Sequence, residues 1–80
     1  MIATAYVLMK VEAGKGKEIH DKLLKLKTVQ HVDAVTGPFD LIVSIQASDF
    51  SELSRIVLDE LQKNKGVEET ITCNVLSFEV

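Results

Sequence analysis

Apolar and polar residues alternate with a period of two in several stretches, and each stretch predicts a β-strand. The first spans residues 2–11, and one of its sides carries Ala3, Ala5, Val7, Met9 and Val11. Its other side is also partly apolar, which favours a central strand buried on both faces. Another strand covers residues 39–47, with an inward side made of Phe39, Leu41, Val43, Ile45 and Ala47.

Two further strands are predicted over residues 29–36 and 67–78. The bend Thr36-Gly37-Pro38 should join the second and third strands into a hairpin, because glycine accepts a positive φ and proline fixes its own φ. In the last strand we assign Ile71, Cys73 and Val75 to the core. The opposite side then carries Thr70, Thr72, Asn74, Leu76 and Phe78.

Two amphipathic helices are expected between the strands. After a turn over residues 12–17, apolar residues recur at helical spacing, at Ile19, Leu23, Leu24 and Leu26. Asp49 and Glu52 resemble a capping box at the start of the second helix. Its apolar stripe consists of Phe50, Leu53, Ile56, Val57 and Leu61. Gly66 suits the position just after a helix end.

The resulting order is β-α-β-β-α-β, which predicts an α+β, ferredoxin-like sandwich forming one domain over residues 1–80. Both helices should cover one face of a four-stranded antiparallel sheet. The 80 residues include 46% hydrophobic and 26% charged residues, as is typical of a globular domain. So short a chain builds only a small core, and such cores are often shared with a second subunit.

The other face of the sheet is left uncovered by this arrangement. The alternation places there Thr4, Tyr6, Leu8, Ile42, Ser44, Leu76 and Phe78. A contiguous patch this apolar usually marks an interface. We therefore expect a homodimer of two-fold symmetry, formed face to face through the sheets as a dimeric α+β barrel. The alternative is a monomer with scattered apolar surface residues.

Charge and composition exclude several classes of protein. The net charge is −3 and no basic run stands apart, so no nucleic-acid footprint is visible. The single cysteine, Cys73, excludes an intrachain disulfide and favours a reducing compartment. No stretch approaches the roughly 18 apolar residues of a membrane span, and no signal peptide is apparent. A cytoplasmic protein without a membrane or nucleic-acid partner is expected.

The sequence shows no positive sign of catalysis, metal binding or a cofactor. The run Gly14-Lys15-Gly16-Lys17 lacks the spacing and the Ser/Thr of a phosphate loop, which favours a solvated turn. His20 and His31 have no Cys or carboxylate at zinc-ligand spacing, which favours surface positions. Cys73 is interpreted as a small buried hydrophobe. We therefore predict that the protein is not an enzyme.

Asp40 has two interpretations from its position alone. It follows the predicted hairpin turn on the open face, at the edge of an apolar surface. Its carboxylate could accept the ammonium group of a small ligand, while backbone N–H groups of the turn bind the ligand's carboxylate. Alternatively, it caps the hairpin locally, as Asx side chains often do.

Two segments taken together resemble the Lrp/AsnC family of feast/famine regulators, in its effector (RAM) domain. They are Val35-Thr36-Gly37-Pro38-Phe39-Asp40-Leu41 and Gly66-Val67-Glu68-Glu69-Thr70-Ile71-Thr72. The resemblance covers essentially the whole chain. It implies a sandwich that dimerises through its sheets and assembles further, to an octamer or a decamer. It also implies that amino acids bind at contacts between dimers.

By position, the resemblance implies a ligand pocket made by the hairpin turn and the neighbouring strand: Thr36, Gly37, Pro38, Phe39, Asp40, Thr70 and Thr72. It favours the ligand-binding interpretation of Asp40. Family regulators carry an N-terminal helix-turn-helix, whereas this chain starts directly on its first strand. We therefore expect a stand-alone amino-acid-sensing module that co-assembles with a full-length regulator. Two alternatives stay open: a small dimeric α+β barrel enzyme such as a cofactor-free monooxygenase, and an assembly module without a ligand.

Overall fold

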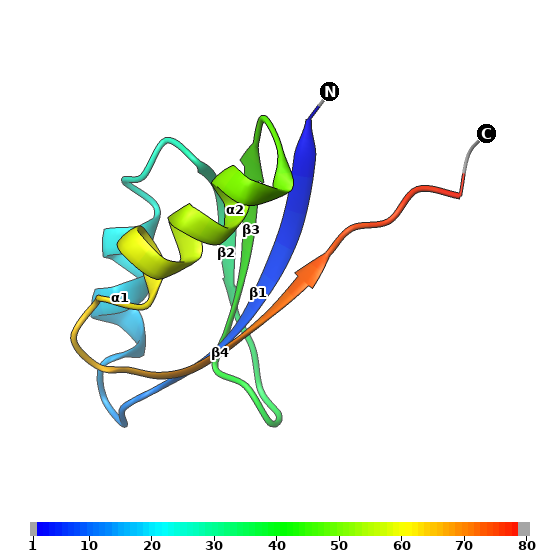
Figure 1. Cartoon of the computed structure of the whole chain (residues 1–80). Coiled ribbons are helices and arrows are strands. Elements are labelled where there is room, and N and C mark those ends of the chain that lie inside the picture. Colours follow the sequence, from blue (N-terminus) through cyan, green and yellow to red (C-terminus); the bar gives the residue numbers. More distant parts are fainter. Residues whose placement is uncertain (1, 79–80) are drawn as a thin grey trace.

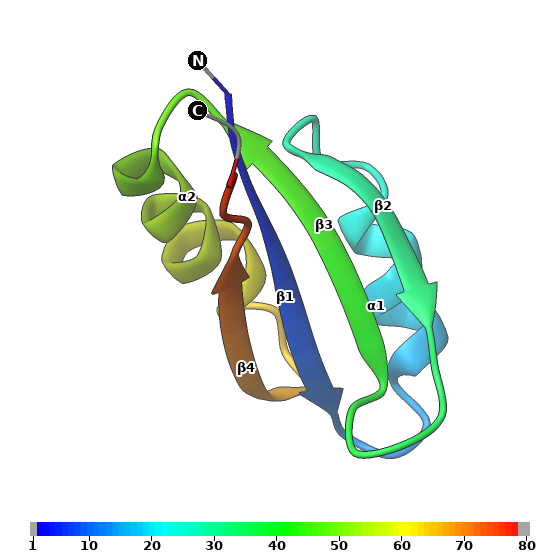
Figure 2. The same ribbon diagram turned by 90° about the vertical axis from the view of Figure 1, so that its right-hand side faces the viewer.

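The computed structural model describes residues 2–78 and has the predicted element order (Figure 1). Its elements are β1 (Ala3–Val11), α1 (Gly16–Leu23), β2 (Val29–Ala34), β3 (Leu41–Ala47), α2 (Phe50–Ile56), a π-helical segment η1 (Val57–Leu61) and β4 (Val67–Asn74). The strands form one antiparallel sheet in the order β2-β3-β1-β4. Both helices lie on the same side of it, and Figure 2 views the sheet from the uncovered side. The predicted fold is confirmed.

The core lies between the sheet and the two helices. The inward side of β1 is buried throughout, as the alternation predicted, and the helices contribute Ile19, Leu23, Leu53, Ile56 and Leu61. The expected central position of β1 is confirmed, because it pairs with both β3 and β4. Two residues assigned to the helical stripes, Leu24 and Phe50, are instead exposed.

The prediction for β4 assigned its two sides the wrong way round. Cys73 lies opposite Tyr6 and Ile71 opposite Leu8, so both face the uncovered side of the sheet, where Cys73 is exposed. Thr72 lies opposite Val7 and therefore faces the helices. The alternation gave the wrong side because α2 contacts β1 and β3 and leaves β4 as a partly uncovered edge strand. Polar residues are tolerated on its inner side for that reason.

The last strand is also shorter than predicted. It ends at Asn74, although the N–H of Val75 still donates to the carbonyl of Thr4 at 2.9 Å. Residues 76–78 form a tail that runs away from the sheet on the side opposite the helices (Figure 1). The assignment of Leu76 and Phe78 to the sheet face is therefore wrong, since these residues lie beyond the strand. Their exposed fractions are 72% and 93%, which are high values for large apolar side chains.

The helix ends are held by side chains close in sequence. Asp49 accepts a hydrogen bond from the backbone N–H of Glu52 at 2.8 Å, which confirms the predicted N-cap. The carboxylate of Glu52 binds Arg55 rather than closing the capping box. Asn64, and not Gly66, satisfies the end of the second helix, because its amide donates to the carbonyls of residues 60 and 61.

Candidate functional site

The turn between β2 and β3 is anchored to the end of β1. Gly37 has a φ of 117°, as predicted from the bend. The N–H of Val35 donates to the carbonyl of Asp40 at 3.0 Å and closes the turn. The N–H of Asp40 donates to the carbonyl of Met9 at 2.9 Å. The strands stop at Ala34 and Leu41, so the connection is longer than the predicted three-residue bend.

Asp40 makes a second bond to β1 through its side chain. Its Oδ2 accepts from the backbone N–H of Val11 at 2.9 Å. The carboxylate thereby supports the neighbouring strand, a structural role related to the capping interpretation but directed at β1. Among residues 2–78 its Oδ1 has no hydrogen-bond partner. One oxygen thus orients the group, and the other remains available as an acceptor.

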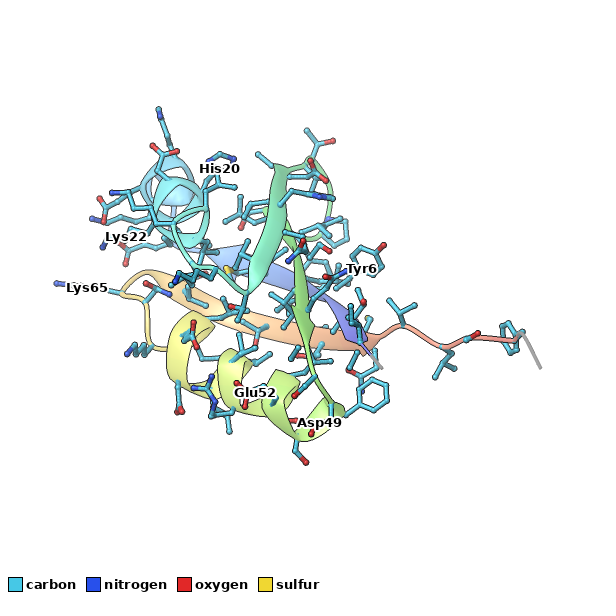
Figure 3. The ribbon with its side chains drawn as sticks, turned by 90° about the horizontal axis from the view of Figure 1, so that it is seen from above. Tyr6, His20, Lys22, Asp49, Glu52 and Lys65 are labelled. Atoms are coloured by element: carbon cyan, nitrogen blue, oxygen red, sulfur yellow. The ribbon has the colours of Figure 1, made fainter. Side chains whose placement is uncertain are left out.

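Asp40 lies at the rim of a hollow between α1 and the hairpin, and not on the open face of the sheet as predicted. The hollow measures about 350 Å³. Its lining comes from α1 and from both hairpin strands: Gly16, Lys17, His20, Asp21, Ala34, Asp40 and Leu41. In Figure 3, His20 extends from α1 toward the hairpin. Pockets for small ligands commonly start at about 300 Å³.

The α1 wall of this hollow is a linked set of charged and polar groups. Asp21 Oδ2 accepts from Lys17 Nζ, and Asp21 Oδ1 contacts His20 Nδ1, each at 2.9 Å. The hydrogen bond with His20, followed by that with Lys17, lowers the pKa of Asp21. Sequence reasoning missed this wall, although positions 17 and 21 share one face of a helix.

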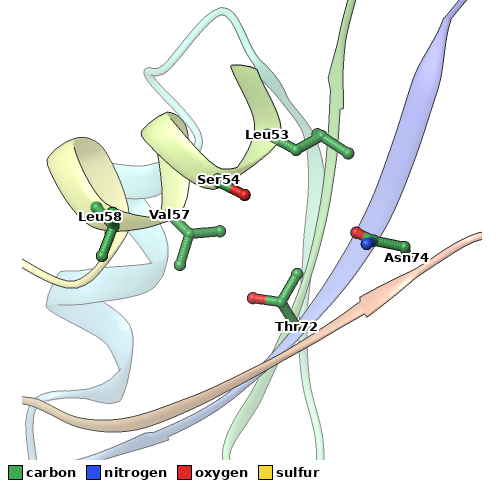
Figure 4. Close-up of a pocket in the computed structure, with 6 residues that line it drawn as sticks. All are labelled: Leu53, Ser54, Val57, Leu58, Thr72 and Asn74. Atoms are coloured by element: carbon green, nitrogen blue, oxygen red, sulfur yellow. The ribbon is translucent and has the colours of Figure 1, made fainter. Parts of the chain in front are cut away.

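Two of the predicted ligand residues lie elsewhere in the same subunit. The hydroxyl of Thr70 accepts a hydrogen bond from Gln62 Nε2 at 2.8 Å. Thr72 lines a separate groove of about 330 Å³ beneath α2 (Figure 4), with Leu53, Ser54, Val57, Leu58 and Asn74. Thr36, Gly37 and Pro38 are exposed at the turn and Phe39 is half-buried. A single subunit therefore does not bring both threonines to the turn.

Residues 2–78 contain neither a metal site nor a helix that could cross a membrane. No group of three or more His, Cys, Asp or Glu side chains in this range is placed to hold a metal ion. Within the same range, no helix has the length and apolar character needed to cross a membrane.

Comparison with known proteins identifies the domain. Residues 4–79 match the family model of the Lrp/AsnC ligand binding domain. The HTH-type transcriptional regulator FL11 of Pyrococcus furiosus is 39% identical over 72 residues, which are 90% of this chain and 47% of that protein. The chain thus spans about half the length of the curated relatives it matches. The family is a regulatory one, which confirms the prediction of a non-enzyme and removes the monooxygenase alternative.

Solved structures agree with this assignment. TTHA0845 from Thermus thermophilus superposes with a TM-score of 0.89 at 28% identity, covering 98% of this chain and 98% of that chain. The transcriptional regulator NMB0573 of Neisseria meningitidis, solved in complex with L-Met, shares the fold with a TM-score of 0.85 at 24% identity, over 95% of this chain and 51% of that one. With the matching fold and family model, the chain belongs to the Lrp/AsnC family and corresponds to its ligand binding domain.

Proposed function

We propose that this domain binds an amino acid effector at Asp40 and that the bound ligand biases its assembly, and thereby transcription. The observation that carries the proposal is the free Oδ1 of Asp40 at the rim of the hollow. The family assignment and the L-Met complex of NMB0573 support an amino acid as the ligand class.

The geometry suits recognition of an ammonium group. A carboxylate held by a backbone N–H is already oriented, so little side-chain freedom is lost when a ligand binds. An ammonium group at Oδ1 would form a charge-assisted hydrogen bond, worth about 1.5–3 kcal/mol. Residues 36–39 would complete the pocket from the turn. Thr70 and Thr72 would have to come from another subunit, since their own subunit places them in other hollows.

Assembly would begin at the uncovered face of the sheet. Tyr6 is paired with Ser44 and Leu8 with Ile42 across β1 and β3, which places these four residues and Thr4 on that face. Ile71 and Cys73, missed by the sequence analysis, extend the surface onto β4. We propose that two copies stack through this face and that Leu76 and Phe78 of each tail contact the other copy. These dimers would assemble further, to an octamer or a decamer, or with a full-length Lrp/AsnC regulator.

For the ligand to control assembly, it must bind two assemblies with different affinity. A ligand that both assemblies bind equally does not shift the equilibrium between them. A pocket completed by a neighbouring subunit meets this condition. The oligomer distribution seen in gel filtration should then respond to the amino acid that binds.

The test compares two substitutions at Asp40 by calorimetry, with an effector found by screening the twenty amino acids in thermal shift. Asp40→Asn keeps an acceptor for the Val11 N–H but removes the charge, so affinity should fall at least about tenfold while the fold is kept. Asp59→Asn, at an exposed carboxylate of η1, is the matched control and should bind normally. Unchanged affinity in Asp40→Asn would reject the assignment of Asp40.

An assembly module without a ligand is the second candidate, because Asp40 already has a structural role at Val11. It is favoured if none of the twenty amino acids raises the melting temperature at any protein concentration.

A further inference from the structure

We propose that α1 is the specificity wall of the effector pocket, and that His20 selects α-amino acids whose side chain donates a hydrogen bond. This inference rests on the proposed function of Asp40. It adds residues from a different element, and it narrows the ligand class from amino acids in general to those with an amide or hydroxyl side chain.

Several polar groups around the hollow are already paired within the domain. Both oxygens of Asp21 are engaged, one by Lys17 and one by His20. One oxygen of Asp40 is engaged by Val11. Among the described residues, this leaves Asp40 Oδ1, the second ring nitrogen of His20 and the remaining N–H groups of Lys17 for a ligand.

The hydrogen bond between Asp21 and His20 determines which ring nitrogen of His20 carries hydrogen. An ionised carboxylate can only accept hydrogen bonds, so the ring nitrogen facing Asp21, Nδ1, must carry hydrogen. In the neutral imidazole the other nitrogen, Nε2, is then an acceptor. The His20 side chain is 29% exposed, compared with 87% for Lys17. Its ring is therefore held by Asp21 and partly desolvated beside the hollow, where an unsatisfied acceptor discriminates between ligands.

The unpaired groups around the hollow suit the separate parts of an amino acid. Asp40 Oδ1 suits the α-ammonium group, and the Lys17 ammonium suits the α-carboxylate. Ala34 and Leu41 offer apolar surface to the methylene groups of the ligand's side chain. His20 Nε2 is left to accept from the end of that side chain. An apolar side chain would leave this acceptor without a partner, and such unpaired polar groups penalise the wrong ligand.

The experiment compares glutamine with methionine, which have side chains of similar length, by calorimetry. The wild-type domain should bind glutamine about tenfold more tightly. His20→Phe should bind both with similar affinity, whereas His20→Gln, which offers a carbonyl acceptor, should retain part of the preference. Lys17→Met should weaken both ligands. Its matched control is Lys22→Met, because Lys22 forms the equivalent i,i+4 pair with Glu18 at 3.6 Å but does not line the hollow.

The outcomes separate the two proposals. Binding that depends on Asp40 but shows no preference for glutamine, or keeps that preference in His20→Phe, would overturn the role of His20 and leave the proposed function standing. The role of α1 also fails if Lys17→Met binds as Lys22→Met does. If no amino acid binds the wild-type domain at all, the proposed function itself fails.

Discussion

At the scale of single residues, Asp40 combines a structural contact with an available acceptor. Its Oδ2 holds the N–H of Val11 where β1 extends beyond the end of β3. A buried or half-buried N–H that loses its partner costs free energy. Asp40 is thus needed to hold the turn against β1 as well as to bind the proposed ligand.

We therefore predict that Asp40→Ala lowers the free energy of unfolding by about 1 kcal/mol in the absence of ligand, because the Val11 N–H loses its acceptor. Asp40→Asn should lose clearly less, since the amide oxygen still accepts. Urea denaturation of both variants measures the difference. Equal losses would mean that the hydrogen bond contributes nothing to stability.

Gly66 provides a second prediction at this scale. Its φ is 102°, and a Cβ built there would lie 3.2 Å from Ile19 Cδ1 and 3.3 Å from Lys15 Cβ. Gly66→Ala should therefore be destabilised both by backbone strain, about 1–3 kcal/mol, and by this crowding. Gly14→Ala is the matched control, because Gly14 has a φ of 83° and open space around it. Thermal unfolding should show the larger loss at Gly66, and equal losses would contradict the packing argument.

At the scale of elements, the short α2 depends on its first turn. Asp49 accepts from the Glu52 N–H and satisfies one of the unpaired N–H groups of the helix start. Asp49→Ala should cost about 1 kcal/mol of stability in chemical denaturation, and Asp49→Ser should recover most of it. A loss as large for serine as for alanine would argue against the capping role.

Both helices also carry carboxylates whose ionised form is stabilised. A hydrogen bond from Arg55 lowers the pKa of Glu52, and one with His20 lowers the pKa of Asp21. Because these pKa values are depressed in the folded state, the stabilisation is complete above the unfolded pKa of about 4 and is lost as pH falls through the folded pKa. Stability should therefore drop between about pH 5 and pH 2. Arg55→Met should flatten this dependence in acid titrations followed by circular dichroism; an unchanged profile would exclude the pair as a contributor.

At the scale of the whole molecule, a single copy exposes large apolar side chains on the uncovered face of the sheet and in the tail. Tyr6 and Ile71 are 45% and 42% exposed on the face, and Phe78 is 93% exposed in the tail. The tail leaves the sheet on that same side, toward the space a stacked second sheet would occupy (Figure 1). Burial of this surface between two copies would remove the cost of exposing it.

Cys73 makes this proposal measurable, because it lies on the uncovered face and is the chain's single cysteine. Its alkylation rate should fall as protein concentration rises and dimers form. Phe78→Ser and Ile71→Asp should restore fast alkylation and shift sedimentation toward the monomer, whereas Leu58→Ser, at an exposed residue of η1, should not. A rate that is independent of concentration while the protein sediments as a dimer would place the interface elsewhere.

Local patterns were sufficient for most of the fold. In β1 and β3 one side is consistently apolar, so alternation alone determines which residues face the core. The positive φ of Gly37 and the cap at Asp49 follow from residue chemistry in the same way. The resemblance of the turn motif led to the correct family for similar reasons, since it is a property of contiguous residues.

Only the tertiary structure decided the faces of β4, the end of that strand and the second wall of the hollow. In β4 one side carries Thr70, Thr72 and Asn74 and the other carries Ile71 and Cys73. The pairing with β1 turns the polar side inward, and the incomplete cover by α2 allows it. Asp40 and His20 line the same hollow only because the sheet places the hairpin beside α1. Hydrophobic periodicity and helix capping depend on residues that are close in sequence. The contacts named here depend on how whole elements pack, and no local pattern contains that information.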